Sequence, residues 1–213
     1  MNKVYTYYEP VEGLEKDDHQ KMITHWRRSW AKQGWNPVVI GKSDAQRHPF
    51  FEEFSQRIMA LPTVNPKEYE ISCFYRWLAV AHLGGGFMSD YDVVNYGFTP
   101  RETPADLICY ETNHSAGQVT PSVVGGTAAG FTNACLAFSL TDPQKLIVEE
   151  DGRPHTSDMI SLQKTYNKHY FIDTAVVKQY GAEDWATADL VHYAHSVTTK
   201  TNRASCMINA RII

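Results

Sequence analysis

Hydrophobic and polar positions change their period several times at the start of the chain, and the changes predict a strand, a helix and a second strand. Residues 4–8 are β-branched and aromatic and end at Glu9-Pro10, as a strand would. From about residue 16 to residue 33 the apolar side chains recur at helical spacing. The apolar residues 38–40 predict the second strand. This order is typical of an α/β sheet.

The next segment predicts two helices and a short strand. Helices are expected at about residues 50–59 and 69–83, and the second of them is largely apolar. Three glycines at positions 84–86 end this helix abruptly. Residues 87–89 then predict a brief strand, and an Asp-Tyr-Asp sequence lies at its end.

The second half of the chain is richer in strand patterns. Strands are expected at residues 107–110, 122–124 and 190–194, whereas residues 133–140 fit either a helix or a strand. Polar residues at 156–158 can cap a further helix. The tail is polar and then mildly apolar, with no clear stopping element, which is compatible with a piece of a longer polypeptide.

Composition narrows the classes of protein. A length of 213 residues suits one domain, and 43% hydrophobic residues can form its core. The net charge is −4 and the basic residues are scattered, so we expect no nucleic-acid partner. No run approaches the roughly 18 apolar residues of a membrane span, and the N-terminus has no apolar signal core. We therefore expect a soluble, cytoplasmic protein without a membrane span.

Residues 76–92 carry the pattern with the most chemical content: an arginine on an apolar helix, the glycines, a short strand, and then Asp90 and Asp92. Residues i and i+2 of an extended segment project to the same face, so the two carboxylates can share a ligand. They repel each other unless a cation lies between them, and oxygen ligands suit Mn²⁺ or Mg²⁺. Such an ion can neutralise a departing diphosphate.

This segment resembles the sugar-binding region, with its DXD motif, of GT-A-fold glycosyltransferases. Those families typically have an arginine, a hydrophobic helix, Gly-Gly, aromatic and hydrophobic residues, and then D-x-D. The segment also resembles the glycosyltransferase domain with which large algal viruses decorate their capsid protein, which would place a viral chain in the host cytoplasm. The resemblance implies a single α/β domain, residues 1–213, with a mixed central sheet flanked by helices. Residues 1–100 would bind the nucleotide sugar, and residues 101–213 would face the acceptor.

The resemblance implies a metal-dependent hexosyltransferase that moves a sugar from a nucleotide-diphosphate sugar, with a UDP-sugar favoured, to a hydroxyl of a glycan or glycoprotein. The end of the first strand would hold the nucleoside, and Arg76 would contact a phosphate or the DXD loop. The donor site implied in this way consists of Tyr5, Thr6, Tyr7, Arg76, Asp90, Tyr91, Gly125, Gly126 and Lys200. The two glycines would form a floor near the sugar, or could instead form an ordinary turn.

The metal site implied by the resemblance holds Mn²⁺ or Mg²⁺. Its ligands would be Asp90, Asp92 and a histidine after a late strand. His192 fits the pattern of the bacterial galactosyltransferases, and His195 is equally compatible with a position at the strand end. The choice between the two histidines stays open.

A catalytic group is harder to assign from sequence. Asp158 occupies the position where bacterial relatives place a polar residue beneath the transferred sugar, and it could act as a general base beside Asp90. It could equally be a helix-start residue that stabilises the first turn. The nearest resemblances favour retention of configuration, but the sequence is compatible with inversion.

Two other functions compete with the transferase. The Asp-x-Asp sequence also fits the first motif of haloacid-dehalogenase-type Mg²⁺-dependent phosphatases, in which Asp90 would be the nucleophile. Those enzymes need a later acidic pair that this sequence lacks, and they carry the motif on their first strand. A non-catalytic nucleotide-sugar-binding module is the other alternative.

Overall fold

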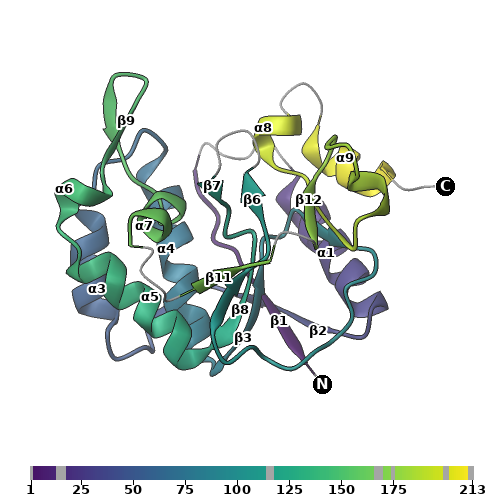
Figure 1. The fold of residues 1–213 in the computed structure, drawn as a ribbon, viewed down its shortest axis with the longest axis horizontal. Helices are drawn as coiled ribbons and strands as arrows, with labels where there is room; N and C mark the ends of the chain where they lie inside the picture. Colours follow the sequence, from purple (N-terminus) through teal and green to yellow (C-terminus); the bar gives the residue numbers. More distant parts are fainter. Residues whose placement is uncertain are drawn as a thin grey trace.

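A six-stranded mixed sheet forms the centre of this computed structural model, and helices cover both of its faces (Figure 1). The structure describes residues 2–12, 18–113, 118–165, 170–173, 176–198 and 202–210. The helices of this part are α1 (His19–Lys32), α2 (Lys42–Ala45), α3 (Phe51–Met59), α4 (Lys67–His82), α5 (Ala128–Leu140), α6 (Pro143–Leu146), α7 (Asp158–Lys164), η1 (Trp185–Thr187), α8 (His195–Thr198) and α9 (Arg203–Asn209). The strands are β1 (Lys3–Tyr7), β2 (Asn36–Ile40), β3 (Gly85–Ser89), β4 (Val93–Asn95), β5 (Leu107–Cys109), β6 (Thr112–Asn113), β7 (Gln118–Val119), β8 (Val123–Thr127), β9 (Val148–Glu150), β10 (Arg153–His155), β11 (Tyr170–Ile172), β12 (Val177–Gln179) and β13 (Leu190–His192).

The strand order in the central sheet is β11-β5-β8-β3-β1-β2. Strand β1 runs parallel to β2 and β3, whereas β8 is antiparallel to its neighbours β3 and β5. The expectation of a single mixed central sheet flanked by helices is therefore confirmed. Because β1 and β3 are parallel, their carboxyl ends reach the same edge of the sheet, where ligands of α/β proteins usually bind.

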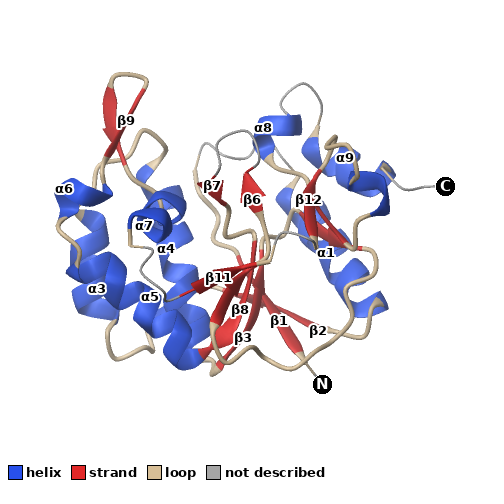
Figure 2. Ribbon diagram, in the orientation of Figure 1, coloured by secondary structure: helices blue, strands red, loops and turns tan. Residues whose placement is uncertain are grey.

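Alternation along the strands divides the core between the two faces. Helix α1 covers one face of the sheet, and α3, α4 and α5 cover the other (Figure 2). Val4 and Phe87 pack with the tryptophans on the α1 side, while Tyr5 and Met88 pack with residues of α3, α4 and α5. The tryptophans on the α1 face are nearly or fully buried: Trp26, Trp30 and Trp35. Two rigid layers therefore hold the strand ends in place from opposite sides.

A smaller sheet, in the order β12-β13-β4, lies beside the central one. Strand β4 follows the Asp-Tyr-Asp sequence directly and pairs antiparallel with β13, in a register that sets Val93 opposite His192. This pairing brings a residue of the last quarter of the chain next to the acidic sequence.

The structure corrects several details of the predicted elements. Gly125 and Gly126 lie inside β8 and form neither a turn nor an open floor, because both pair with β3. Residues 133–140 belong to helix α5. The tail, for which no element was predicted, contains α9, whose Ala204 and Met207 pack with Met22 of α1. Within the described residues, no helix is long and apolar enough to cross a membrane.

Candidate metal and nucleotide-sugar site

A cavity of about 750 Å³ opens at the edge of the sheet where β1 and β3 end. Tyr7 and Tyr8 line it from the end of β1, and residues 90–92 line it from the turn after β3. Further charged side chains reach it from α4, α7, α9 and β13, namely Arg76, Asp158, Arg203 and His192. The cavity therefore collects groups that are far apart in sequence.

Glycine makes the approach to the acidic sequence possible. Gly85 begins β3 with a φ of +80°, and a Cβ atom there would lie 2.5 Å from the backbone nitrogen of Ala128. At the other end of the strand, the amide of Asp90 donates to the carbonyl of Ser122 at 2.7 Å. The amide of Tyr193 donates to the carbonyl of Asp92 at 2.9 Å. The backbone of the acidic turn is thus fixed on both sides.

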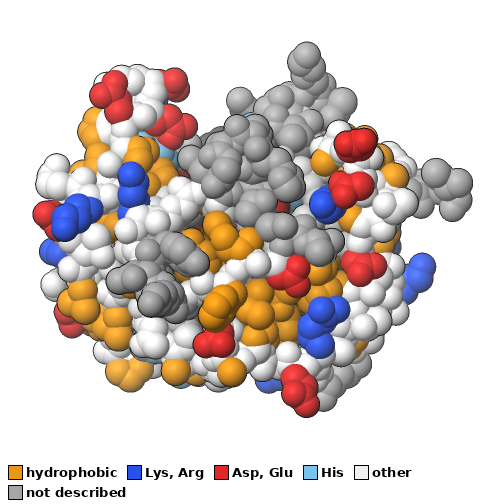
Figure 3. All heavy atoms as spheres, viewed as in Figure 1, with side chains coloured by type: hydrophobic (Ala, Val, Ile, Leu, Met, Phe, Trp, Pro, Cys, Tyr) orange, Lys and Arg blue, Asp and Glu red, His pale blue; other side chains and the backbone are white. Residues whose placement is uncertain are grey.

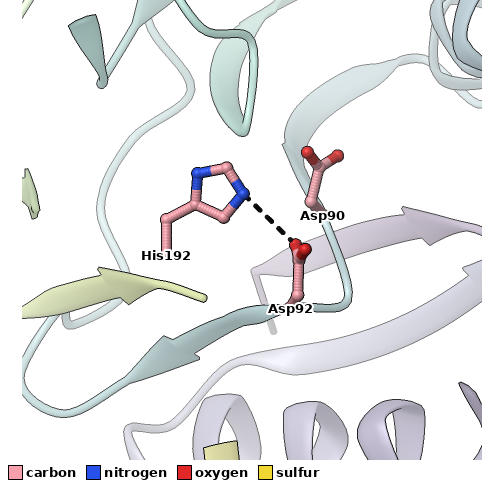
Figure 4. A group of neighbouring side chains, drawn as sticks. All are labelled: Asp90, Asp92 and His192. Carbon is pink, nitrogen blue, oxygen red and sulfur yellow. Dashed lines mark ion pairs between the residues drawn. The ribbon is translucent and has the colours of Figure 1, made fainter. Parts of the chain in front are cut away.

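Asp90, Asp92 and His192 form a group that could hold a metal ion (Figure 4). One ligand atom of each side chain lies within 4.8 Å of those of the other two. Figure 4 shows the imidazole of His192 directed toward the two carboxylates, with an ion pair of 3.5 Å between its Nε2 and Oδ1 of Asp92. Two carboxylates and an imidazole suit Mn²⁺, and the oxygens also suit Mg²⁺.

His192 is held in this orientation by Glu111. Its Nδ1 donates a hydrogen bond to Oε2 of Glu111 at 2.8 Å, and the hydroxyl of Ser122 donates to the same oxygen. Burial acts to lower the pKa of His192, but the carboxylates of Glu111 and Asp92 outweigh it and raise that pKa well above its usual range. A carboxylate behind a histidine is the usual support of a metal-binding imidazole, because it leaves the other nitrogen facing the ion. The residues therefore fit a divalent cation.

Arg76 links the acidic turn to helix α7. Its Nη1 donates to Oδ1 of Asp90, while its Nη2 and Nε donate to Oδ2 of Asp158 at 2.6 and 3.0 Å. The indole of Trp77 donates to the same oxygen at 3.0 Å. Asp158 is also the first residue of α7, which Ser157 caps through the amide of Ile160. The hydrogen bonds to Asp90 and Asp158 together fix the orientation of the Arg76 guanidinium at the cavity wall.

Arg203 approaches the other aspartate from α9. Its Nη1 donates to Oδ2 of Asp92 at 2.8 Å. Burial acts to raise the pKa of Asp92, but the charges of His192 and Arg203 outweigh it, and the pKa is lowered. The pKa of Asp90 is raised, mainly by burial and also by the neighbouring Asp92 carboxylate, against the opposing charge of Arg76. The two acids therefore differ in how readily they hold a negative charge.

The residues expected in the donor site fall into distinct places. Tyr7 and Tyr91 line the cavity, whereas Tyr5 packs in the core between the sheet and the helices. Thr6 is fully buried, and its hydroxyl has no partner among the described residues.

The two glycines of the expected donor site lie away from the cavity. In β8, Gly125 faces the ring of Phe87 and Gly126 faces Leu107. Lys200 lies outside the described residues.

The two candidate histidines also separate. His192 is buried and belongs to the group with the two aspartates, while His195 is exposed at the start of α8 and lines the cavity outside that group. Sequence reasoning missed Glu111 and Arg203. Both come from segments without a motif: Glu111 follows β5, which pairs with β8, and Arg203 lies on α9, which packs on α1.

The comparisons with known proteins bear on the fold. A family described as "Domain of unknown function (DUF8765)" matches residues 1–104, and no curated protein sequence matches the chain. A solved structure described as a glycosyltransferase involved in the glycosylation of the major capsid of PBCV-1 is similar over 97% of this chain and 98% of that one. Its TM-score is 0.56 and its sequence identity is 11%.

A second similar structure is that of WbbM, a bifunctional glycosyltransferase in its apo form. It matches over 91% of this chain, with a TM-score of 0.51 and 8% identity. The match covers 45% of the WbbM chain, so this chain spans less than half of that protein's length. In both cases the sequence identity is low, and the likeness is one of architecture. The chain therefore has an α/β fold similar to that of these glycosyltransferases.

Proposed function

We propose that this chain is a metal-dependent glycosyltransferase of the hexosyltransferase type. It would move a sugar from a nucleotide-diphosphate sugar, with a UDP-sugar favoured, to a hydroxyl of a glycan or glycoprotein. The observation that carries the proposal is the group of Asp90, Asp92 and His192 inside a cavity of about 750 Å³ at the carboxyl ends of β1 and β3. A cavity of this volume is large enough for a small-molecule ligand. The similar architecture of two glycosyltransferases supports the same assignment.

Different residues of the cavity would bind different parts of the donor. Tyr7 and Tyr8, at the end of β1, would contact the nucleoside, and Tyr91 packs edge-on against Tyr8 with ring centroids 5.9 Å apart. Asp90, Asp92 and His192 would hold Mn²⁺ or Mg²⁺. When bound, such an ion would supply positive charge that stabilises the departing diphosphate.

Two guanidinium groups are positioned for the same negative charge. Arg76 contacts Asp90 and Arg203 contacts Asp92, and guanidinium forks match phosphate oxygens. Such fixed cations lower the barrier only if they stay in place as charge develops. Asp158 keeps Arg76 in place, and an oxygen that accepts three hydrogen bonds is a poor general base. We therefore assign Asp158 to positioning rather than to proton transfer.

Calorimetry tests the proposal directly. UDP, GDP and dTDP and their sugar conjugates would be titrated into the protein with and without Mn²⁺. One nucleotide should bind in a Mn²⁺-dependent manner, and Asp92→Asn should lose that binding by at least about tenfold. Asp106→Asn, an exposed aspartate outside the cavity, is the matched control and should bind normally.

A contrary result has a clear form. If no nucleotide binds, and the protein instead releases phosphate from small phosphate esters with Mg²⁺, the transferase proposal is wrong and the phosphatase interpretation replaces it. If the nucleotide binds but no transfer or donor hydrolysis occurs, the chain is a nucleotide-sugar-binding module.

A further inference from the structure

The cavity continues beyond the two arginines to an end that the donor site does not use. This end lies between the first turns of α4 and the hairpin of β9 and β10, and its lining includes Asn65, Tyr69, Glu70, Glu150 and His155. Hydrogen bonds fasten the two sides together. The amide of Val64 donates to Nδ1 of His155 at 3.2 Å, and the amide of Thr156 donates to the carbonyl of Pro62 at 2.9 Å. These hydrogen bonds therefore fix the two segments that form the wall at this end of the cavity.

Glu70 is the first unusual residue of this wall. It is only 5% exposed, and its Oε1 accepts a hydrogen bond from the side-chain Nδ2 of Asn65 at 2.8 Å. Its Oε2 has no hydrogen-bond partner among the described residues. Burial, together with the charge of Asp158, raises the pKa of Glu70 to about 7, although the hydrogen bond from Asn65 acts against the shift. A buried carboxyl oxygen without a partner costs free energy, and because Glu70 lines the cavity, a ligand bound there would be able to supply that partner.

Tyr69 is the second. It is 42% exposed although it lines the cavity, so part of its large ring is open to solvent. Tyr69 and Arg76 are seven residues apart on α4 and therefore lie on the same helix face, about 10 Å apart along the axis at 1.5 Å per residue. That separation leaves room for a transferred sugar between the diphosphate end and the tyrosine ring.

The charge of this end selects among ligands. Glu149 and Glu150 line the cavity from the hairpin, and acidic side chains gather at that corner of the surface (Figure 3). Glu70 lines this end as well, and Lys164 is the lysine in the cavity lining that the described residues form, so carboxyl groups outnumber ammonium groups here. An anionic ligand would be repelled here, while a neutral polyhydroxylated one would not.

We infer that this end of the cavity is the acceptor subsite, and that it takes a neutral glycoside. The sugar ring stacks on Tyr69, and its hydroxyl groups bond to Glu70 and Asn65. An aromatic ring supplies apolar contact to one face of a sugar, and a carboxyl beside an amide supplies oriented donors and acceptors at its edge. The inference rests on the proposed transferase function, because it places the acceptor beside the donor.

Saturation-transfer NMR tests the subsite with defined probes. Methyl glucoside, methyl galactoside and methyl mannoside would be titrated into the intact chain with Mg²⁺, which is diamagnetic and does not broaden the ligand signals, and glucose 6-phosphate would serve as the anionic counterpart. At least one methyl glycoside should bind, and glucose 6-phosphate should bind at least tenfold more weakly than methyl glucoside. Binding of none of the glycosides, or equal binding of the phosphorylated sugar, overturns the inference.

Variants connect the binding to the residues. Tyr69→Ala should weaken glycoside binding about tenfold, whereas Tyr69→Phe keeps the ring and should bind normally. Glu70→Met removes the polar atoms at similar length and should also weaken it, and thermal unfolding would verify that the variant is folded. Phe171→Ala, an aromatic residue that is 55% exposed on β11 and does not line the cavity, is the matched control.

The failure of this inference is distinguishable from failure of the proposed function. All of these variants leave the metal group intact, so Mn²⁺-dependent nucleotide binding by calorimetry should be unchanged in each of them. If the nucleotide binds but Tyr69→Ala and Glu70→Met take up the glycoside like the parent protein, only the acceptor subsite is wrong. If the glycoside binding depends on both residues and no nucleotide binds, only the donor proposal is wrong.

Discussion

His192 lies between the carboxylates of Asp92 and Glu111. Asp92 lines the cavity and belongs to the Asp-Tyr-Asp sequence, whereas Glu111 does not line the cavity and belongs to no motif. Glu111 is 1% exposed, and it accepts hydrogen bonds from His192 and from Ser122. The charge that it carries orients the imidazole and compensates for its burial. At the scale of single residues, Glu111 therefore orients His192, and His192 in turn contacts the acidic pair through Asp92.

Replacement of Glu111 by glutamine tests this support. Glu111→Gln keeps the shape but removes the charge behind His192, so the affinity for Mn²⁺ should fall by about ten- to a hundredfold. Electron paramagnetic resonance of free Mn²⁺ measures this affinity without any activity assay. Glu183→Gln, an exposed glutamate outside the cavity, should leave it unchanged. An unchanged affinity in Glu111→Gln would show that His192 needs no support, or is no ligand.

Glu70 gives the protein a pH-dependent stability. Its pKa is about 7 in the folded protein and 4.5 in its unperturbed state, so the folded state favours the protonated form. The stability that this group contributes is complete below about pH 4.5 and is lost as the pH rises through about 7. Glu70→Gln does not ionise, so its advantage in free energy of unfolding over the parent should grow across this window by roughly 1–3 kcal/mol. Urea unfolding at a series of pH values measures the difference, and a constant difference would contradict the assignment.

Among the elements, the position of β8 between β3 and β5 explains why two glycines follow one another in a buried strand. A Cβ atom on Gly125 would lie 2.8 Å from the ring of Phe87, and one on Gly126 would lie 2.8 Å from Leu107. Glycine is needed at both positions because Phe87 and Leu107 pack closely against the backbone of β8, and this packing explains the two glycines without a ligand. The resemblance to a sugar-binding floor came from the same two residues because both uses of glycine look alike in sequence.

This structural role predicts separate effects on stability and binding. Gly125→Ala should lower the free energy of unfolding by about 1–3 kcal/mol, because the added methyl group overpacks the core. Nucleotide binding measured by calorimetry should be unaffected in the folded variant. Gly130→Ala is the matched control, since its new Cβ would meet Leu107 and Thr127 only at ordinary van der Waals distances, and it should be neutral or stabilising by about 0.5–1 kcal/mol. Loss of nucleotide binding in a stably folded Gly125→Ala would restore these glycines to the donor site.

Arg203 of helix α9 contacts a candidate metal ligand, so we expect it to affect metal binding and diphosphate binding in opposite directions. Arg203 occupies Oδ2 of Asp92, where it competes with a metal ion, but it also adds positive charge for the diphosphate. Arg203→Met should therefore raise the affinity for free Mn²⁺ several-fold and lower the affinity for the nucleoside diphosphate about tenfold. The two affinities come from separate titrations, the first by electron paramagnetic resonance and the second by calorimetry. A parallel fall of both would indicate that α9 only stabilises the fold.

The elements differ in how far sequence could predict them. Helix α4 and strands β1 and β3 followed from periodicity and from the glycine break, because their signals are local. The acidic pair followed from the same local pattern. Arg203 could not be predicted, because its place depends on a short terminal helix packed against α1. Tyr5 was misplaced because alternation along β1 fixes which side chains enter the core, and that register is set by β2 and β3.

At the scale of the whole molecule, the two halves of the chain contribute adjacent parts of one sheet, which meet where β3 of the first half pairs with β8 of the second. Strand β8 from the second half separates β3 from β5, and α5, which follows it, packs on α4 in the main core. The family match to residues 1–104 and the expected division near residue 100 both cut through this arrangement. A chain ending at residue 104 would keep Asp90 and Asp92 but would lose His192, and it would leave β3 as an open edge.

A fragment of residues 1–104 is therefore expected not to fold by itself. It lacks β8, α5 and α7. Met88 and Trp77 would therefore lose partners such as Val124 and Phe131 on the face of the sheet that α3, α4 and α5 cover. Circular dichroism should show no cooperative thermal transition for the fragment, while the 213-residue chain should show one. Addition of residues 105–213 as a separate chain is the control, because complementation would restore the sheet and the histidine together. A cooperative transition in the fragment alone would mean that residues 1–104 form an autonomous unit, and that His192 and Arg203 are additions to a site which the first half builds without them.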